Sequence, residues 1–227
     1  CRTSLVKNLR HKNVRTCKKV FNDYNKTIKL AGYSQDNKTR ELAQTAPRHR
    51  YQQRSKHMTF LQLASNRYSC RKFQTKPVAE SEINTLLEAI RLTPTAHNKQ
   101  PLHAWVITDE INRNKIKETT LYHYNAPLYV VIGYNPNESW VRSFDNENHG
   151  YVDASLAVAS YWFAAADNGL GTVCVSDFDP EKLYNLFPEM KDHHILAIMP
   201  TGYPAEDAKP AKWHTDSKDI TEMVTYL

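Results

Sequence analysis

Apolar positions follow helical spacing in several segments downstream of residue 58. Within 81–93 they recur every three or four residues, and Ser81 lies where an N-cap would begin this helix, which Pro94 would end. The segment 153–167 is apolar nearly all round, which predicts a helix buried at the centre of the fold. Shorter helices are predicted over 60–64, over 110–119 and from Asp179 and Pro180 onward, where a capping residue precedes proline.

Four further runs have the composition of strands. The run 128–134 is rich in β-branched and aromatic residues, which is typical of a buried strand. Shorter strands are predicted over 104–108, 172–175 and 195–201. Because helices and strands are mixed along the chain and do not strictly alternate, the pattern predicts an α+β fold, with a mixed or mostly antiparallel central sheet flanked by helices.

Charge divides the chain into two parts of opposite sign. The formal net charge is +6, yet residues 1–57 hold 15 of the 30 Lys and Arg residues and only 3 of the 24 acidic ones. We expect 58–227 to be the folded domain and 1–57 to be a basic extension, whose few apolar residues cannot offset the entropy of ordering. The extension could be an appended segment without a role, a disordered tail or a nucleic-acid arm. Its scattered aromatic residues argue against the last of these.

Composition disfavours several classes of protein. No run of 18 or more apolar residues is present, so we expect no membrane-spanning helix, and we expect no secretory signal at the start. The cysteines have no Cys-x-x-Cys spacing, which favours reduced thiols in the cytoplasm and no zinc site. The histidines also lack metal-ligand spacing, and no serine lies in a Gly-x-Ser-x-Gly context.

The stretch 66–73 places two arginines, a lysine and a hydroxyl in a short run that ends on an aromatic residue. Arg67, Ser69 and Arg71 alternate along it. A loop can therefore present all three side chains to one anion, where guanidinium groups pair bidentately with phosphate oxygens. Taken alone, the run is better explained as a solvated basic turn, and the stretches downstream change that interpretation. Cys70, inside it, is either a thiol of lowered pKa or a small buried filler, and we favour the filler.

A second dense stretch spans 93–101, after a predicted helix and before a predicted strand. Pro94 and Pro101 flank small hydroxyl residues and two carboxamides, Asn98 and Gln100. A carboxamide offers both a donor and an acceptor, which suits the edge of a planar heterocycle with alternating C=O and N–H groups. An asparagine-containing turn without a ligand is the alternative.

Five motifs in series resemble those of the nitroreductase family, in family order over 58–227. They are Arg67-Tyr68-Ser69-x-Arg71-x-Phe73, Pro94-Thr95-Ala96-x-Asn98-x-Gln100-Pro101, Asn168-Gly169-Leu170-Gly171-Thr172, Phe178-Asp179-Pro180-Glu181 and Gly202-Tyr203-Pro204-Ala205-Glu206. Residues 1–57 lie outside the resemblance. It implies an α+β fold assembled as an intertwined homodimer, with FMN as the cofactor and NAD(P)H as the reductant.

The resemblance implies three groups of FMN-binding positions. Arg67 and Ser69, with Tyr68 between them, would hold the phosphate. Arg71 would lie near N1 and O2 of the isoalloxazine, where a positive charge favours the reduced flavin. A loop made of Pro94, Thr95, Ala96, Asn98 and Gln100 would bind the ring, and much of it would reach the cofactor of the partner subunit. Ser176 and Asp177 would bring backbone to the N5 and O4 edge.

The C-terminal part of the expected phosphate site departs from the family pattern. The family commonly completes this site with a basic pair, whereas this chain has no arginine after Arg142. Lys212, His214 and Lys218 therefore stay open as candidates. The long polar tail from Pro204 ends in apolar residues, which predicts that it packs on another subunit.

The expected activity is that of an FMN-dependent NAD(P)H oxidoreductase. The resemblance implies a ping-pong reaction in which hydride passes from NAD(P)H to flavin N5 and then to a nitroaromatic, a quinone or an enone. No catalytic side chain is expected, because the protein supplies binding, orientation and electrostatics. One alternative is a specialised enzyme of the same superfamily, a reductive dehalogenase or a flavin-cleaving enzyme, with 135–151 as its lid. A non-enzymatic flavin-binding or nucleic-acid-binding protein is the other.

Overall fold

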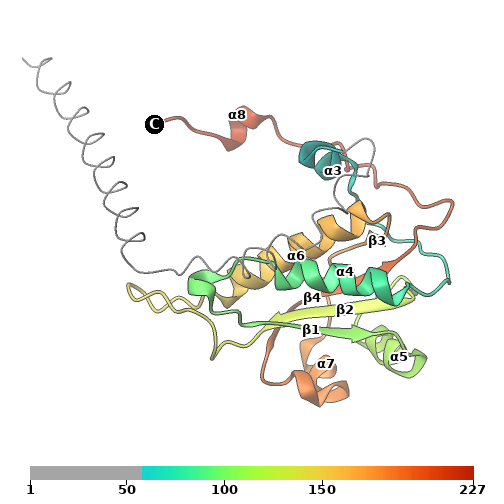
Figure 1. Ribbon diagram of the computed structural model, residues 1–227, viewed down its shortest axis with the longest axis horizontal. Coiled ribbons are helices and arrows are strands. Elements are labelled where there is room, and N and C mark those ends of the chain that lie inside the picture. Colours follow the sequence, from blue (N-terminus) through green and yellow to red (C-terminus); the bar gives the residue numbers. More distant parts are fainter. Residues whose placement is uncertain (1–57) are drawn as a thin grey trace, which may run out of the picture. The chain divides into compact units, whose positions relative to one another are not determined.

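The protein is built around a four-stranded sheet, seen edge-on in a computed structural model that describes residues 58–227 (Figure 1). The predictions for residues 1–57 lie outside the described residues. The strand order is β1-β2-β4-β3, and every neighbouring pair is antiparallel. The described elements are α3 (Phe60–Asn66), α4 (Glu80–Arg91), the 3₁₀ turn η2 (Ala96–Asn98), β1 (Leu102–Ile107), α5 (Glu110–Thr119), β2 (Leu128–Tyr134), α6 (Gly150–Asp167), β3 (Gly171–Thr172), α7 (Pro180–Leu186), the 3₁₀ turn η3 (Pro188–Met190), β4 (His194–Gly202) and α8 (Ile220–Met223).

Strand β2 lies at the centre of the core, and all seven of its residues are buried. Val130 and Ile132 pack with residues of α4 and α6, whereas Tyr129 and Val131 pack with residues of α5 and α7. Figure 1 shows these two helix pairs on opposite faces of the sheet. A strand covered on both faces needs apolar residues at successive positions, which explains the unbroken apolar run in its sequence.

The predicted α+β class and the antiparallel sheet are confirmed, and β2 and α5 have their predicted bounds. Helix α4 is a correction, because it begins at Glu80 with Ala79 as the N-cap residue and Ser81 lies inside its first turn. The Glu82 carboxylate accepts the backbone N–H of Ala79 at 3.2 Å. This bond satisfies an N–H at the start of the helix without a capping serine.

The strand predicted over 172–175 is also shorter than expected. Strand β3 pairs with β4 through only two residues, Gly171 and Thr172. After them the chain leaves the regular pairing and returns for a single bridge between Val175 and Ile198. The apolar character of 172–175 is therefore explained by burial beside the sheet, since Val173 and Val175 are both buried.

Helix α6 begins at Gly150, earlier than predicted, and it is only partly buried, contrary to expectation. Its inner face packs against the core through small and aromatic residues such as Ala157 and Tyr161. On the other face, Val152 is 48% exposed and Leu156 is 44% exposed. A helix that is apolar all round is suited to burial on both sides. Within the described chain, the outer side of α6 has no such cover at Val152 and Leu156. Helix α3 packs on the later part of α6, where Phe60 contacts Phe163.

After β4 the chain turns back along residues 72–74. Ala205 donates its backbone N–H to the carbonyl of Lys72 at 3.1 Å, and Gln74 donates to the carbonyl of Tyr203 at 2.9 Å. These bonds direct the tail toward the segment 67–71. The tail ends beyond α8 with large apolar residues exposed. Among the described helices, none has the length and apolar character needed to cross a bilayer.

Candidate functional site

Residues 67–71, which we call the basic loop, connect α3 to the edge of the sheet at β3. The backbone N–H of Arg67 caps the last turn of α3. At the other end, the N–H of Cys70 donates to the carbonyl of Thr172 at 3.1 Å. Glycine at 171 allows this approach, because a Cβ there would lie 2.6 Å from the Cys70 sulfur. The loop is thus fixed to the fold at both ends.

The side chains of the basic loop line a pocket of about 240 Å³, which we call the basic pocket. No salt bridge within the described residues involves Arg67 or Arg71. Arg71 donates to the Ser69 carbonyl at 3.3 Å, and the Arg67 guanidinium carbon lies 4.4 Å from the centroid of the Trp162 ring. The pocket is lined by Arg67, Tyr68, Ser69, Arg71, Ala211, Trp213 and His214.

The electrostatics of the basic pocket favour an anion. Partial burial lowers the pKa of the Arg67 guanidinium from its ordinary value, yet an arginine stays charged at neutral pH. Neither arginine is neutralised by a carboxylate of the described chain. Two guanidinium groups and a serine hydroxyl therefore offer charge-assisted hydrogen bonds to one group of negative oxygens.

The tail supplies a further polar side chain to this pocket, His214. Its Nε2 lies 2.9 Å from the Ser65 carbonyl, and its ring meets the Tyr68 ring edge-on with centroids 6.4 Å apart. Lys212 instead holds its Nζ 4.9 Å from the centroid of the Trp213 ring and does not line the pocket. Of the three basic residues that the sequence left open, His214 is the one that the fold brings there.

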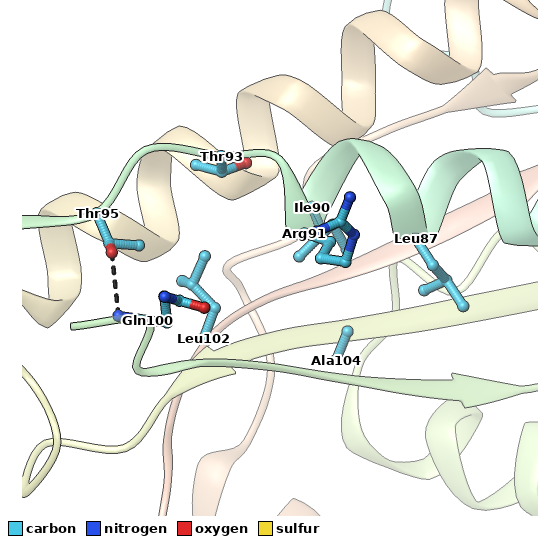
Figure 2. A pocket seen from close by; sticks show the side chains of 8 residues that line it. All are labelled: Leu87, Ile90, Arg91, Thr93, Thr95, Gln100, Leu102 and Ala104. Atoms are coloured by element: carbon cyan, nitrogen blue, oxygen red, sulfur yellow. Dashed lines mark hydrogen bonds between the residues drawn. The ribbon is translucent and has the colours of Figure 1, made fainter. Parts of the chain in front are cut away.

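Residues 94–101, the 94–101 loop, connect α4 to β1. Three of its residues, His97, Asn98 and Gln100, have φ angles of 52°, 53° and 54°. Residues other than glycine adopt this left-handed region rarely. The Thr95 hydroxyl oxygen accepts the backbone N–H of Gln100 at 3.0 Å, which closes the loop on itself (Figure 2).

Figure 2 shows a pocket of about 280 Å³ between α4 and β1, next to the 94–101 loop. Thr95 and Gln100, two of the predicted flavin-binding residues, lie at one end of it. Arg91 lines it too, but its guanidinium makes two hydrogen bonds to the Glu88 carboxylate, which balance its charge. The remaining lining residues are Leu87, Ile90, Thr93, Leu102 and Ala104.

Ser176 and Asp177 lie in a third place, beyond the end of β3, and both are exposed. The Thr120 hydroxyl donates to the Asp177 carbonyl at 2.6 Å, which ties this segment to the end of α5. Asp177 lines a depression of about 260 Å³ together with Leu121 and Tyr122. This depression shares no lining residue with the basic pocket.

Helix α6 separates the basic loop from the 94–101 loop within one chain. Ala96 donates its N–H to Asp153 near the start of the helix, and Arg67 stacks on Trp162, nine residues further along it. At the rise of an α-helix, nine residues correspond to about 14 Å. The basic pocket contains no residue of the 94–101 loop, and the pocket of Figure 2 contains none of the basic loop.

Other candidates have structural roles. Cys70 is fully buried with its sulfur 3.3 Å from the Lys72 carbonyl, and burial raises the pKa of its thiol. It is therefore the small buried filler and not a reactive thiolate. Within 58–227, no three His, Cys, Asp or Glu residues are grouped so that they could hold a metal ion.

Two tryptophans at the basic pocket were not predicted from the sequence. Trp213 lines the pocket, and Trp162 packs on Arg67. Helical spacing could have placed Trp162 on a face of the long apolar segment, but nothing in the sequence pairs that face with Arg67. Trp213 comes from the tail, whose path depends on backbone bonds to residues 72–74.

Comparison with known proteins is consistent across sequence and fold. The Nitroreductase family model matches residues 64–123 and 122–203. A Bacillus subtilis protein named FMN reductase [NAD(P)H] is 24% identical over 177 residues, covering 70% of this chain and 71% of that protein. A nitroreductase family protein of Clostridium difficile 630 superposes with a TM-score of 0.70 at 28% identity, covering 74% of this chain and 98% of that one.

A further solved structure shows the same fold at lower identity. It comes from Desulfovibrio desulfuricans, is in complex with FMN, and superposes with a TM-score of 0.63 at 20% identity, covering 76% of this chain and 98% of that one. The match to the family model spans most of the described domain and includes the basic loop, the 94–101 loop and β4. The chain therefore belongs to the nitroreductase family.

Proposed function

We propose that the protein is an FMN-dependent oxidoreductase that takes hydride from NAD(P)H and reduces a nitroaromatic, a quinone or a similar acceptor in a ping-pong cycle. The observation that carries the proposal is the basic pocket, in a chain of this family. Its two arginines have no carboxylate partner in the described chain, and a serine hydroxyl and a histidine lie beside them. The name of the Bacillus subtilis relative, which mentions both FMN and NAD(P)H, supports the same conclusion.

The donor set of the basic pocket fits the phosphate of FMN. Arg67 and Ser69 would hold the phosphate, with Tyr68 beside them and His214 completing the pocket from the tail. Arg71 would lie nearer the isoalloxazine, where its positive charge favours the reduced state. When bound, FMN supplies the chemistry by accepting hydride from NAD(P)H and passing it to the acceptor. The chain's own residues bind and orient, and none is required as an acid or a base.

The other two groups of predicted residues would contact the ring. Pro94, Thr95, Ala96, Asn98 and Gln100 would bind the flavin from the 94–101 loop, and Ser176 and Asp177 would present backbone to its N5 and O4 edge. We propose that the 94–101 loop acts mainly on the cofactor of a partner subunit in a homodimer. Two observations support this arrangement: the separation of about 14 Å along α6, and the exposed apolar face formed by Val152 and Leu156.

A spectroscopic experiment on the purified full chain tests the function. We expect a yellow protein that releases FMN on denaturation at one equivalent per chain. Its flavin absorbance should be lost when NADPH or NADH is added without oxygen, and it should return when a quinone is added. A protein that stayed colourless after incubation with FMN would overturn the proposal. A yellow protein bleached by dithionite but by neither nicotinamide nucleotide would retain the cofactor assignment and overturn the reductant.

A further inference from the structure

Asp153 is a buried carboxylate that connects α6 to the 94–101 loop. Asp153 lies in the first turn of α6 and is only 2% exposed. Its Oδ1 accepts the backbone N–H of Ala96 at 2.9 Å. Its other oxygen, Oδ2, is buried and has no hydrogen-bond partner in the described chain. One carboxylate oxygen is thus committed to the loop while the other is left unsatisfied.

This arrangement is unfavourable for folding alone. A buried acceptor without a partner retains the penalty of leaving water, and a carboxylate retains more of it than a neutral group does. The partial positive charge at the start of α6 offsets part of that penalty. The bond to Ala96 is thus made although the second carboxylate oxygen stays buried and unpaired in the described chain.

The 94–101 loop needs such support because of its backbone. His97, Asn98 and Gln100 all lie in the left-handed region, which residues with a Cβ adopt rarely, asparagine less rarely than the others. Several such residues in one loop persist only where the surroundings hold them. Ala96, the residue that Asp153 binds, immediately precedes the first of them.

A second contact holds the loop from another direction. The segment 135–149, the 135–149 loop, returns to α6 and places Trp140 against His97, with ring centroids 4.9 Å apart and an interplanar angle of 24°. Trp140 also contacts His149, which lies one turn before Asp153. Asp153 thus binds Ala96 and Trp140 packs on His97, so two different segments contact neighbouring residues of the 94–101 loop.

We propose that Asp153 is a positioning residue that, together with Trp140, holds the 94–101 loop in its flavin-binding conformation before the cofactor arrives. This inference rests on the proposed function, and on Ala96 and its neighbours being flavin contacts. A loop that is already ordered loses less conformational entropy when a ligand binds, so the held loop binds more tightly than a loose one. Asp153 acts only through the loop and needs no contact with the cofactor.

Two substitutions at position 153 separate the hydrogen bond from the charge. Asp153→Asn keeps an oxygen that can accept the Ala96 N–H, whereas Asp153→Ala removes it. In the flavin-free protein, we expect Asp153→Ala to speed amide hydrogen exchange across 94–101, and Asp153→Asn to leave it near the wild-type rate. For FMN, we expect Asp153→Ala to raise the Kd about tenfold and Asp153→Asn to change it by less than about threefold, since one buried hydrogen bond is at stake. Asp192→Ala, at an exposed acid, is the matched control and should change neither quantity.

Trp140→Ala tests the second contact, with Phe144→Ala as its control. Phe144 lies in the same 135–149 loop but is 95% exposed. We expect Trp140→Ala to speed exchange over 94–101 and to weaken FMN binding, and Phe144→Ala to do neither. If Asp153→Ala does not fold, this pair decides the proposal.

Three results would overturn the positioning role. They are an Asp153→Ala protein with wild-type exchange and FMN affinity, an Asp153→Asn protein as impaired as Asp153→Ala, and a Trp140→Ala protein no different from Phe144→Ala. Failure of the proposed function looks different. In that case the wild type itself would bind no FMN, while the exchange comparison would still report whether Asp153 and Trp140 hold the loop.

Discussion

Arg67 and Trp162 form a cation–π pair, with the guanidinium carbon 4.4 Å from the centroid of the indole ring. A cation over an indole ring is attracted by the negative face of the ring, and this contact uses none of the guanidinium's hydrogen-bond donors. It also joins the basic loop to α6, the helix that carries Asp153 near its start. One of the two arginines of the basic pocket is thus held against α6 by a residue that makes no hydrogen bond with it.

Removing the Arg67 side chain should weaken FMN binding. We expect Arg67→Ala to cost roughly 2–4 kcal/mol, because charge-assisted bonds are lost and the phosphate is left with an unpaired oxygen. Fluorescence titration of the flavin-free protein with FMN measures this. Arg142→Ala is the control, since Arg142 is partly exposed, lies outside the basic pocket and is paired with Asp145. Unchanged affinity in Arg67→Ala would show that the phosphate lies elsewhere.

His214 should matter more for FMN than the lysines near it. We expect His214→Ala to raise the FMN Kd about fivefold to tenfold, through loss of one polar contact and of its packing on Tyr68. Lys212→Ala and Lys218→Ala should each change the Kd by less than about threefold, as exposed charges contribute little. Riboflavin, which lacks the phosphate, should bind all three variants equally. A larger effect from either lysine would contradict the assignment.

Dimer formation and FMN binding should be thermodynamically linked. A ligand bound between two subunits stabilises only the associated state, so FMN should shift association to lower protein concentrations. Sedimentation velocity over a dilution series, with and without FMN, measures the shift. We expect Leu156→Glu, on the exposed face of α6, to weaken association and FMN binding together, and Ile111→Glu, exposed on α5, to do neither. A 26.3 kDa species that carries one equivalent of FMN would contradict the shared site.

A chain that begins at Met58 should keep the function. Residues 58–227 form one unit with its own two hydrophobic clusters, and the candidate site residues all lie within it. We expect this shortened chain to bind FMN and to turn over at the full-length rate. Loss of flavin or of folding, measured by absorbance and circular dichroism, would show that 1–57 belongs to the domain. RNA binding by the full chain that disappears on shortening would instead favour the nucleic-acid interpretation.

The thiol of Cys70 should be inert in the native protein. Burial raises its pKa, so at pH 8 it stays protonated as well as inaccessible. We expect no alkylation of Cys70 by iodoacetamide in the native state and complete alkylation in guanidinium chloride, both measured by mass spectrometry of the peptide that contains it. Rapid native labelling would indicate that the basic loop separates from β3.

Sequence alone was informative where one physical demand dominated a segment. Strand β2 is covered on both faces, so its unbroken apolar run revealed where it begins and ends. Helix α5 begins after Asp109, whose side chain accepts the N–H of Asn112 at 2.9 Å. The polar residues of α5 showed how far this helix extends. The alternating Arg67, Ser69 and Arg71 were expected to face one site, and the structure places all three at one pocket. That this pocket binds a phosphate stays a prediction.

The remaining features depend on contacts between distant segments. Ser81 looked like a cap, but Glu82 provides the first bond of α4 instead. The left-handed residues of the 94–101 loop could not be predicted, since none is glycine and their support comes from α6 and from Trp140. His214 could not be chosen over Lys212 without knowing how the tail pairs with residues 72–74. The apolar outer face of α6 was mistaken for core because an apolar composition does not show whether the rest of the chain covers a face, and Val152 and Leu156 are exposed.

Helix α6 has a further consequence for how this protein can change. Asp153 supports one loop and Trp162 orients the other, and the two are joined by uninterrupted helix. Inserting or deleting one residue between them would turn one end against the other by about 100° and shift it by about 1.5 Å. Substitutions along the helix can be absorbed locally, whereas a change in its length would misalign both loops at once. The length of α6 therefore sets the spacing and the relative orientation of the two loops. Among related proteins, we expect the length of this helix to vary far less than its amino-acid composition.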